Sequence, residues 1–262
     1  ALLAYAAMGE LDAFMFANFY SIFYRAPATS GELPLRLVRI TAFVAPLIIL
    51  GVLGAKREFR KRPSITYDFV AIWFFVACLG VLALGTYFRH YALPLFLPGA
   101  VVTATAFGAS GPLRRFALGT LLIAFVIGQL MLFDVKRMSG SRAMLDRMVA
   151  SMHRHPGCLF IYNGHPILYH MSRRCRTTRY WLPSHFSKAN EANALGVDID
   201  FETRHILSQR PGLIVTTLPA RPTENRQTRA ILNAAIARDY ALVHAEQAGR
   251  TVHQLYALRR TR

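Results

Sequence analysis

The stretch that decides the fold is Tyr87-Phe88-Arg89-His90-Tyr91-Ala92-Leu93-Pro94-Leu95-Phe96-Leu97-Pro98. It joins two apolar runs, residues 66–85 and 92–109, and each is close to the roughly 20 residues that cross a bilayer as a helix. Its Arg, His and Tyr side chains would therefore lie at a membrane-water boundary, where side chains with an apolar body and a polar tip are enriched. Taken alone, the stretch indicates an aromatic belt with one interfacial cation.

The composition divides the chain into a membrane part and a soluble part. Of its 262 residues, 53% are hydrophobic, yet the formal net charge is +17. The apolar runs crowd into the first half, whereas the sequence from Ser139 onward has an ordinary globular composition. Many basic residues flank the apolar runs, where positive charge fixes topology and meets anionic lipid. Membrane lipid is thus an expected partner, and nucleic acid is not, because no motif for its recognition is found.

The apolar runs predict four membrane-spanning helices, over residues 37–54, 66–85, 92–109 and 116–133. Lys and Arg gather in the turn at residues 56–63, which the positive-inside rule assigns to the cytoplasm. The preference is mild, since the outer ends of the spans also carry Lys and Arg. The predicted domains are an interfacial helix and loop over residues 1–35, a four-helix transmembrane region over 36–135 and a soluble α/β domain over 136–262.

The segment from Leu2 to Tyr24 is long and apolar enough to span a membrane, but Glu10 and Asp12 lie near its middle. A central Asp costs about 2.5 to 3.5 kcal/mol on insertion scales. We therefore predict an interfacial helix, with its Phe and Tyr residues against lipid. The alternative is that Glu10 or Asp12 is a functional acid within the membrane.

The soluble domain alternates predicted helices and strands. Helical spacing marks residues 141–155, and further helices are predicted over 200–209 and 224–238. Strands are predicted over residues 158–162, 212–217, 240–245 and 251–258. This order predicts a mostly parallel sheet in two or three layers, closed by a C-terminal antiparallel hairpin.

Two segments resemble a known family of membrane enzymes. His90-Tyr91-Ala92-Leu93-Pro94-Leu95-Phe96-Leu97-Pro98 is similar to the HYxLPxxP signature near the C-terminal end of the membrane region in bacterial GT-C glycosyltransferases. Tyr162-Asn163-Gly164-His165-Pro166-Ile167-Leu168-Tyr169, leading to Arg173-Arg174 and Thr178-Arg179-Tyr180, resembles the run xxGxxPxLYxxSxRxxxTRY in the domain that follows. These GT-C glycosyltransferases resemble the dolichyl-phosphate-mannose and aminoarabinose transferases. Such enzymes take a sugar from a polyprenyl-phosphate carrier on the outer face of the membrane.

The resemblance implies a multi-pass protein of the bacterial inner membrane whose C-terminal domain is extracytoplasmic. Its partners would be a polyprenyl-phosphate sugar and a glycan, lipid or protein acceptor. In the family, the catalytic base belongs to the first extracytoplasmic loop, and this chain is expected to begin after that loop. We therefore name no catalytic residue and expect the isolated chain to be inactive. No cofactor is identified, and a divalent metal stays open for the full-length enzyme.

Arg89 is the leading candidate for a functional residue, because a guanidinium at the lipid boundary can grip a phosphate with two hydrogen bonds. His90 and Tyr91 would add hydrogen-bond donors beside it. The competing interpretation of all three is interfacial anchoring. Four polar residues of the first segment are candidates for lining the same cavity: Glu10, Asp12, Asn18 and Tyr20.

The remaining signals are weaker. Cys78 lies in an apolar run and indicates packing, whereas Cys158 and Cys175 could pair if their domain is in an oxidising compartment. The His residues do not have the spacing of a helical zinc site, so no metal site is predicted. The arginines between Arg173 and Arg179 form either a solvated loop or a surface for an acidic glycan or lipid headgroups.

The runner-up function is a non-catalytic membrane protein whose α/β domain is a glycan- or partner-binding module. A transporter is a third class, and it is less favoured because the spans lack paired halves with broken helices.

Overall fold

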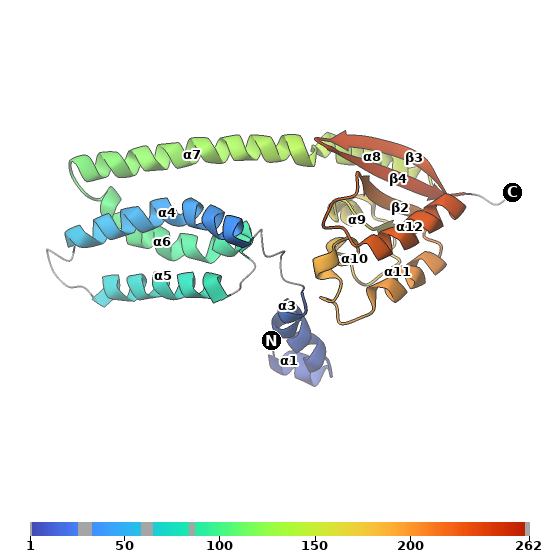
Figure 1. Ribbon diagram of the computed structural model, residues 1–262, viewed down its shortest axis with the longest axis horizontal. Coiled ribbons are helices and arrows are strands. Elements are labelled where there is room, and N and C mark those ends of the chain that lie inside the picture. Colours follow the sequence, from blue (N-terminus) through green and yellow to red (C-terminus); the bar gives the residue numbers. More distant parts are fainter. Residues whose placement is uncertain (1, 26–32, 59–64, 84–86, 260–262) are drawn as a thin grey trace. The chain divides into compact units, whose positions relative to one another are not determined.

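The computed structural model describes residues 2–25, 33–58, 65–83 and 87–259. The chain separates into two compact units, one of residues 27–132 and one that combines residues 1–26 with 133–262. The first unit is built of helices and the second carries the sheet (Figure 1). Residues 26–32, which belong to the predicted loop, and residues 59–63 of the predicted basic turn lie outside the described residues.

The chain contains helices that are long and apolar enough to cross a membrane. Three such runs occur in the described residues, namely Leu33–Gly54, His90–Phe107 and Pro112–His153. They fall in α4 (Leu33–Glu58), in η2 (Arg89–Ala92) with α6 (Leu93–Phe107), and in α7 (Pro112–Ser139), where the third run continues into α8 (Arg142–His153). The fourth predicted span corresponds to α5 (Ile65–Ala83), whose described apolar part, Asp68–Ala83, is shorter.

Within the first unit, α6 packs against α4 and α5. Ile40 and Val44 of α4, Val81 of α5 and Leu95 of α6 form one buried apolar cluster. Gly51 of α4 allows the close approach, since a Cβ atom there would lie 2.7 Å from Cγ1 of Val102. Small residues at helix crossings are typical of membrane bundles, where the association of helices depends on close packing.

Most of α7 is not covered by protein. Its large apolar side chains are exposed, and they include Leu121, Leu122, Ile123, Phe125, Leu130 and Phe133. A surface this apolar requires a non-aqueous surrounding or another protein. In a helix that satisfies its own backbone hydrogen bonds, contact with lipid is the simplest solution.

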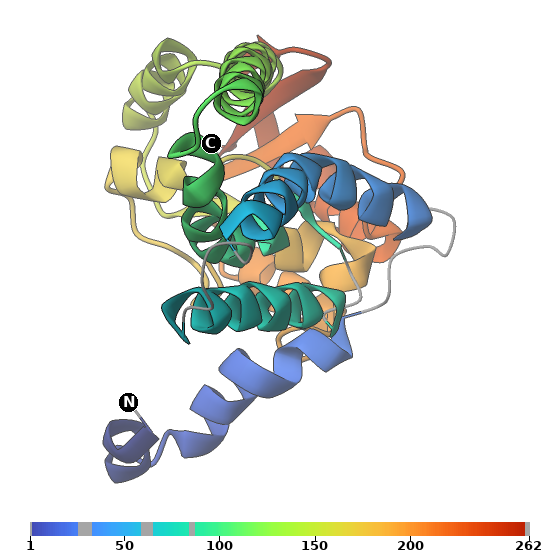
Figure 2. The ribbon, with the colours of Figure 1, turned by 90° about the vertical axis from the view of Figure 1, so that its left-hand side faces the viewer.

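The first segment is broken into short helices rather than forming the single helix that the sequence predicted. They are α1 (Leu2–Ala7), α2 (Leu11–Met15), the π-helix η1 (Phe16–Tyr20) and α3 (Ser21–Tyr24). Gly9 causes the first break, because its φ of +72° is left-handed and ends α1. Figure 2 shows α1 turning away from the helices that follow it. Arg25, just after α3, forms an ion pair of 3.3 Å with Glu191 of the same unit.

The sheet consists of β1 (Leu159–Ile161), β2 (Leu213–Leu218), β3 (Tyr240–Ala248) and β4 (Thr251–Leu258), in the order β1-β2-β4-β3. β1 and β2 are parallel, whereas β4 is antiparallel to both β2 and β3. The predicted strands and C-terminal hairpin are confirmed, but the prediction of a mostly parallel sheet is wrong. The reason is that β4 folds back between β2 and β3, so β1 and β2 form the one parallel pair among the described strands.

Helices cover both faces of the sheet (Figure 1). Met144, Met148 and Met152 of α8 (Arg142–His153), together with α9 (Ile167–Ser172), pack on the face that carries Leu159 and Ile161. The other face carries Phe160, Tyr162 and Ile214 and is covered by α10 (Ser184–Ser187), α11 (Ile199–Ser208) and α12 (Arg226–Asp239). A short 3-10 helix, η3 (Ala189–Glu191), follows α10. We refer to this sheet and its helices as the α/β domain.

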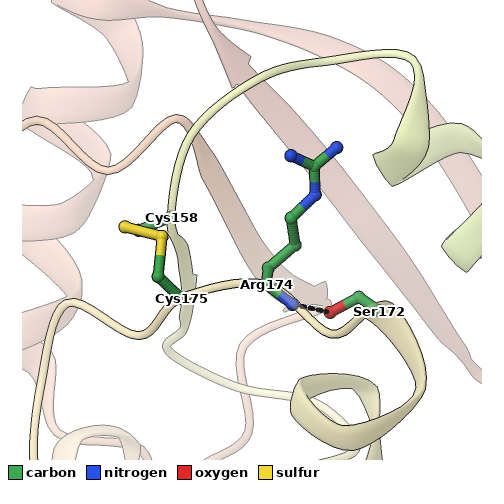
Figure 3. Close-up of a disulfide and its surroundings, with 4 residues drawn as sticks. All are labelled: Cys158, Ser172, Arg174 and Cys175. Atoms are coloured by element: carbon green, nitrogen blue, oxygen red, sulfur yellow. Dashed lines mark hydrogen bonds between the residues drawn. A yellow bond between two sulfur atoms is a disulfide. The ribbon is translucent and has the colours of Figure 1, made fainter.

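A disulfide joins Cys158 and Cys175, the pair that the sequence left open (Figure 3). The backbone N–H of Leu159 also donates to the carbonyl of Cys175 at 2.8 Å, and Leu159 bridges Arg176 in parallel. The loop that follows α9 is therefore fastened to the outer edge of β1 by covalent and hydrogen bonds.

Candidate functional site

The boundary stretch forms the short helix η2 and the first turn of α6. The ring of His90 lies 4.5 Å from the ring of Tyr91 and 5.7 Å from that of Phe88. The guanidinium of Arg36, from the start of α4, lies 4.5 Å above the Phe88 ring. The structure thus places a second arginine beside this stretch, and no signal in the sequence connected the two. The side chain of Arg89 lies outside the described part of the chain.

The four polar residues of the first segment belong to the other unit. Asn18 donates from Nδ2 to the carbonyl of Phe14 at 2.8 Å, so its amide is partly satisfied within its own segment. Glu10 immediately precedes α2 and makes no capping hydrogen bond with its side chain. Glu10, Asp12, Asn18 and Tyr20 are all exposed. Their role in lining a cavity stays a prediction.

A pocket opens at the carboxyl ends of β1 and β2, which is where open α/β sheets generally bind their ligands. Its volume is about 290 Å³. We call it the carboxyl-end pocket, and its polar lining includes Ser139, Asn163, His165, Lys188, Arg221 and His253. Sequence reasoning missed it, because its residues come from α7, α10, β2 and β4 and from the loops between these elements.

The turn after β1 positions one wall of this pocket. Gly164 has a φ of +151°, and a Cβ atom there would lie 3.0 Å from Cγ1 of Val215. Glycine therefore lets the turn pass close to β2 and presents His165 to the pocket. His165 donates from Nε2 to the carbonyl oxygen of Ser139 at 2.9 Å. Because Ser139 is the last residue of α7, the pocket begins where that helix ends.

His253 enters the pocket from β4 and is only 6% exposed. Its ring stacks on that of His165 with 5.0 Å between the centroids. Burial, reinforced by His165 and Arg221, lowers the pKa of His253 to about 4. Its Nδ1 atom is buried and has no hydrogen-bond partner among the described residues. A neutral imidazole with an unused nitrogen is suited to bind a polar ligand.

The pocket is electrostatically positive. Lys188 and Arg221 line it and are exposed, and no Asp or Glu occurs among the described residues of its lining. Ser184, Ser187 and Thr217 add hydroxyl groups. Cations with hydroxyl and imidazole groups match a phosphate or the hydroxyls of a sugar. Within the described part of the chain, no three His, Cys, Asp or Glu side chains gather as a metal site would require.

A buried ion pair supports the loop that carries Arg221. Nε of Arg229 lies 3.2 Å from Oε1 of Glu224, and both residues are almost fully buried. Glu224 accepts from the backbone N–H of Arg221 at 3.1 Å through its other oxygen. Arg229 donates to the hydroxyl of Thr216 and to the carbonyl of Thr217 at the end of β2. The pair therefore ties the loop after β2 to the strand itself.

No protein-family model matches the chain, and no curated protein or solved structure matches it significantly. The family resemblance therefore rests on the two sequence segments alone.

Acidification is expected to destabilise the α/β domain through His253. Its pKa is about 4 in the folded domain, against about 6.5 in an unfolded chain. The unfolded state binds the proton more readily than the folded state. The contribution of His253 to the free energy of unfolding is therefore fully present above pH 6.5 and falls towards pH 4, by on the order of 2 to 3 kcal/mol.

The measurement is urea unfolding of the whole chain in detergent at pH 7 and pH 4.5. Trp181 can report on the α/β domain in a Trp73→Phe background, since the chain has two Trp residues. In the His253→Gln variant the stability difference between the two pH values should shrink. An unchanged difference would show that other groups cause the pH dependence.

Proposed function

We propose that this chain is the C-terminal portion of an integral-membrane glycosyltransferase. It would move a sugar from a polyprenyl-phosphate donor to an extracytoplasmic glycan, lipid or protein acceptor. The observation that carries the proposal is the carboxyl-end pocket. It gathers Lys188, Arg221 and two imidazoles at the end of α7, a helix long and apolar enough to lie in a bilayer. Such a position suits the sugar of a lipid-linked donor, and the carrier phosphate itself is proposed to bind Arg89.

The reaction defines what the protein must supply. The acceptor hydroxyl oxygen bonds to the anomeric carbon of the sugar, and the bond from that carbon to the carrier phosphate oxygen breaks. The phosphate leaves with the electron pair, so cations and hydrogen-bond donors lower the barrier by stabilising its charge. A general base must take the proton of the acceptor. This chain supplies the groups for the phosphate, and no residue in it is assigned as the base.

The disulfide supports the outer location of the α/β domain. Disulfides persist in oxidising compartments such as the bacterial periplasm and are rare in the cytosol. The bond between Cys158 and Cys175 therefore favours the orientation in which this domain follows α7 out of the inner membrane. Labelling of a cysteine at position 141 in intact cells tests this orientation, and labelling at position 64 instead would contradict it.

Arg89 is the residue proposed to hold the carrier phosphate, with His90 and Tyr91 beside it. Arg89→Ala is expected to weaken binding of a polyprenyl phosphate to the chain in detergent micelles by tenfold or more, since a hydrogen bond to a charged group contributes about 1.5 to 3 kcal/mol. Arg89→Lys should recover only part of the loss, because an ammonium cannot reproduce the planar fork of a guanidinium.

Arg39 provides a matched control, because it is an exposed arginine of α4 near the same predicted boundary. Arg39→Ala should leave the affinity unchanged. If Arg89→Ala binds as well as the unmodified chain, Arg89 is an interfacial anchor and the assignment is wrong. Sugar transfer itself requires the complete protein in proteoliposomes, and absence of transfer there would favour the binding-module alternative.

A further inference from the structure

A second, larger hollow lies at the opposite end of the sheet, where β1 and β2 begin. Its volume is about 1090 Å³, and we call it the arginine cavity because Arg154, Arg176, Arg210 and Arg259 line it. A neighbouring hollow of about 540 Å³ shares Arg176 with it and extends to Arg179. No Asp or Glu occurs among the described residues that line either hollow.

Two of the arginines that line this cavity have guanidinium groups that are available to bind a ligand. Arg176 and Arg210 are exposed and form no hydrogen bond or ion pair through their guanidinium groups in the described part of the chain. Asp239 interacts electrostatically with Arg210 and Arg259 and forms an ion pair of 2.9 Å with Arg238. The pKa of Asp239 is lowered mainly by Arg238, and Arg210 and Arg259 contribute less. With four arginines and no Asp or Glu among the described residues of its lining, the cavity is positively charged.

The loop that carries Arg176 is held in place before any ligand arrives. The disulfide fixes Cys175 to Cys158 at the start of β1. Figure 3 shows Arg174 beside the disulfide, where its backbone N–H donates to the hydroxyl of Ser172. Arg174 donates to the carbonyls of Met152 and His155 at 3.0 and 2.7 Å, which ties the loop to the end of α8. A cavity ordered in advance loses less entropy when it binds.

We propose that the arginine cavity binds a segment of an anionic glycan that carries carboxylate, sulfate or phosphate groups. Guanidinium forks match these groups bidentately. The volume is at the upper limit of pockets for drug-sized ligands, roughly 300 to 1,000 Å³, so it suits several sugar residues rather than one small ion. Ala241, Val243 and Pro156 add apolar wall for the faces of the sugar rings.

Two features favour a glycan over other polyanions. The disulfide indicates an oxidising compartment such as the periplasm or the cell surface rather than the cytosol or nucleus, which argues against a nucleic acid as the ligand. The cavity also lies at the end of the sheet away from Ser139, where the chain leaves α7, which argues against lipid headgroups as the ligand. The inference goes beyond the proposed function, because such binding does not require sugar transfer.

The test is binding of a fluorescent polygalacturonate fragment to the whole chain in detergent micelles. Arg176→Gln/Arg210→Gln should raise the Kd at least tenfold, and the binding of the unmodified chain should weaken with added salt. Arg204→Gln/Arg226→Gln removes the same charge from exposed positions outside the cavity and should change the Kd less than twofold.

Three results would overturn the proposal. The first is an equal loss of affinity for the polygalacturonate fragment in both double variants, which would indicate a general charge effect. The second is binding of neutral dextran with the same affinity as the polygalacturonate fragment. The third is binding of anionic vesicles that Arg176→Gln/Arg210→Gln weakens as much as it weakens glycan binding. Arg89→Ala should not affect this assay, so failure here is distinct from failure of the glycosyltransferase proposal.

Discussion

Replacing Arg229 with methionine is expected to lower the free energy of unfolding of the α/β domain by about 3 to 5 kcal/mol, the cost of leaving a buried charge without its partner. Glu224 and Arg229 are only 6% and 7% exposed, so water cannot replace the lost guanidinium. The loss should be compounded at Thr216 and Thr217, which would both lose the donors that Arg229 provides. Urea unfolding followed through Trp181 in the Trp73→Phe background measures it.

Two variants make this measurement specific. Glu224→Gln/Arg229→Met removes both charges and should recover a large part of the stability, because no ion remains buried without a partner. Arg204→Met changes an exposed arginine of α11 and should shift stability by no more than about 0.5 kcal/mol. A loss of less than about 1 kcal/mol in the free energy of unfolding for Arg229→Met would mean that the ion pair is hydrated. The pair would then not hold the loop that carries Arg221 in place.

Removing the disulfide is expected to have the second largest effect. Cys158 and Cys175 are separated by 17 positions, and closing a loop of this length stabilises a domain by about 3 kcal/mol in the chain-entropy description. Cys158→Ser/Cys175→Ser should therefore lower the urea midpoint reported by Trp181. Dithiothreitol should lower the midpoint of the unmodified chain by a similar amount and leave that of the double variant unchanged.

Cys78 supplies the control for this experiment, because it is the free cysteine of the described residues and belongs to α5. Cys78→Ser should leave the unfolding of the α/β domain unaffected. If dithiothreitol destabilises the double variant as much as the unmodified chain, the effect of the reductant does not come from the disulfide.

The elements of this fold could be predicted where a local pattern dictates them. Phe160 and its apolar neighbours form a short continuous run, and the strand they predict is buried on both faces. Met144, Met148 and Met152 follow a helical period, and α8 presents them to the sheet. Membrane-length helices were equally predictable, because length and apolar composition alone decide whether a helix can span.

The arrangement of these elements could not be predicted, because it depends on contacts between distant residues. Nothing in the run of β4 indicates that it pairs with β2 as well as with β3, and that pairing brings His253 onto His165. The ion pair of Glu224 and Arg229 likewise gives no sequence signal, since either residue alone is typical of an exposed helix start. The carboxyl-end pocket was missed for this reason.

Both outer strands of the sheet are protected against pairing with a foreign strand. On β1, the backbone of Cys175 and Arg176 occupies part of the outer edge, and the disulfide keeps it there. On β3, the ladder is irregular between Leu242 and His244, and Glu246 is engaged by Arg147 of α8 at 2.6 Å. Bulges and charges on outer strands discourage intermolecular β-sheet formation. A concentrated preparation of this domain should therefore resist edge-to-edge aggregation, and breaking the disulfide should expose β1 as a site where such aggregation can begin.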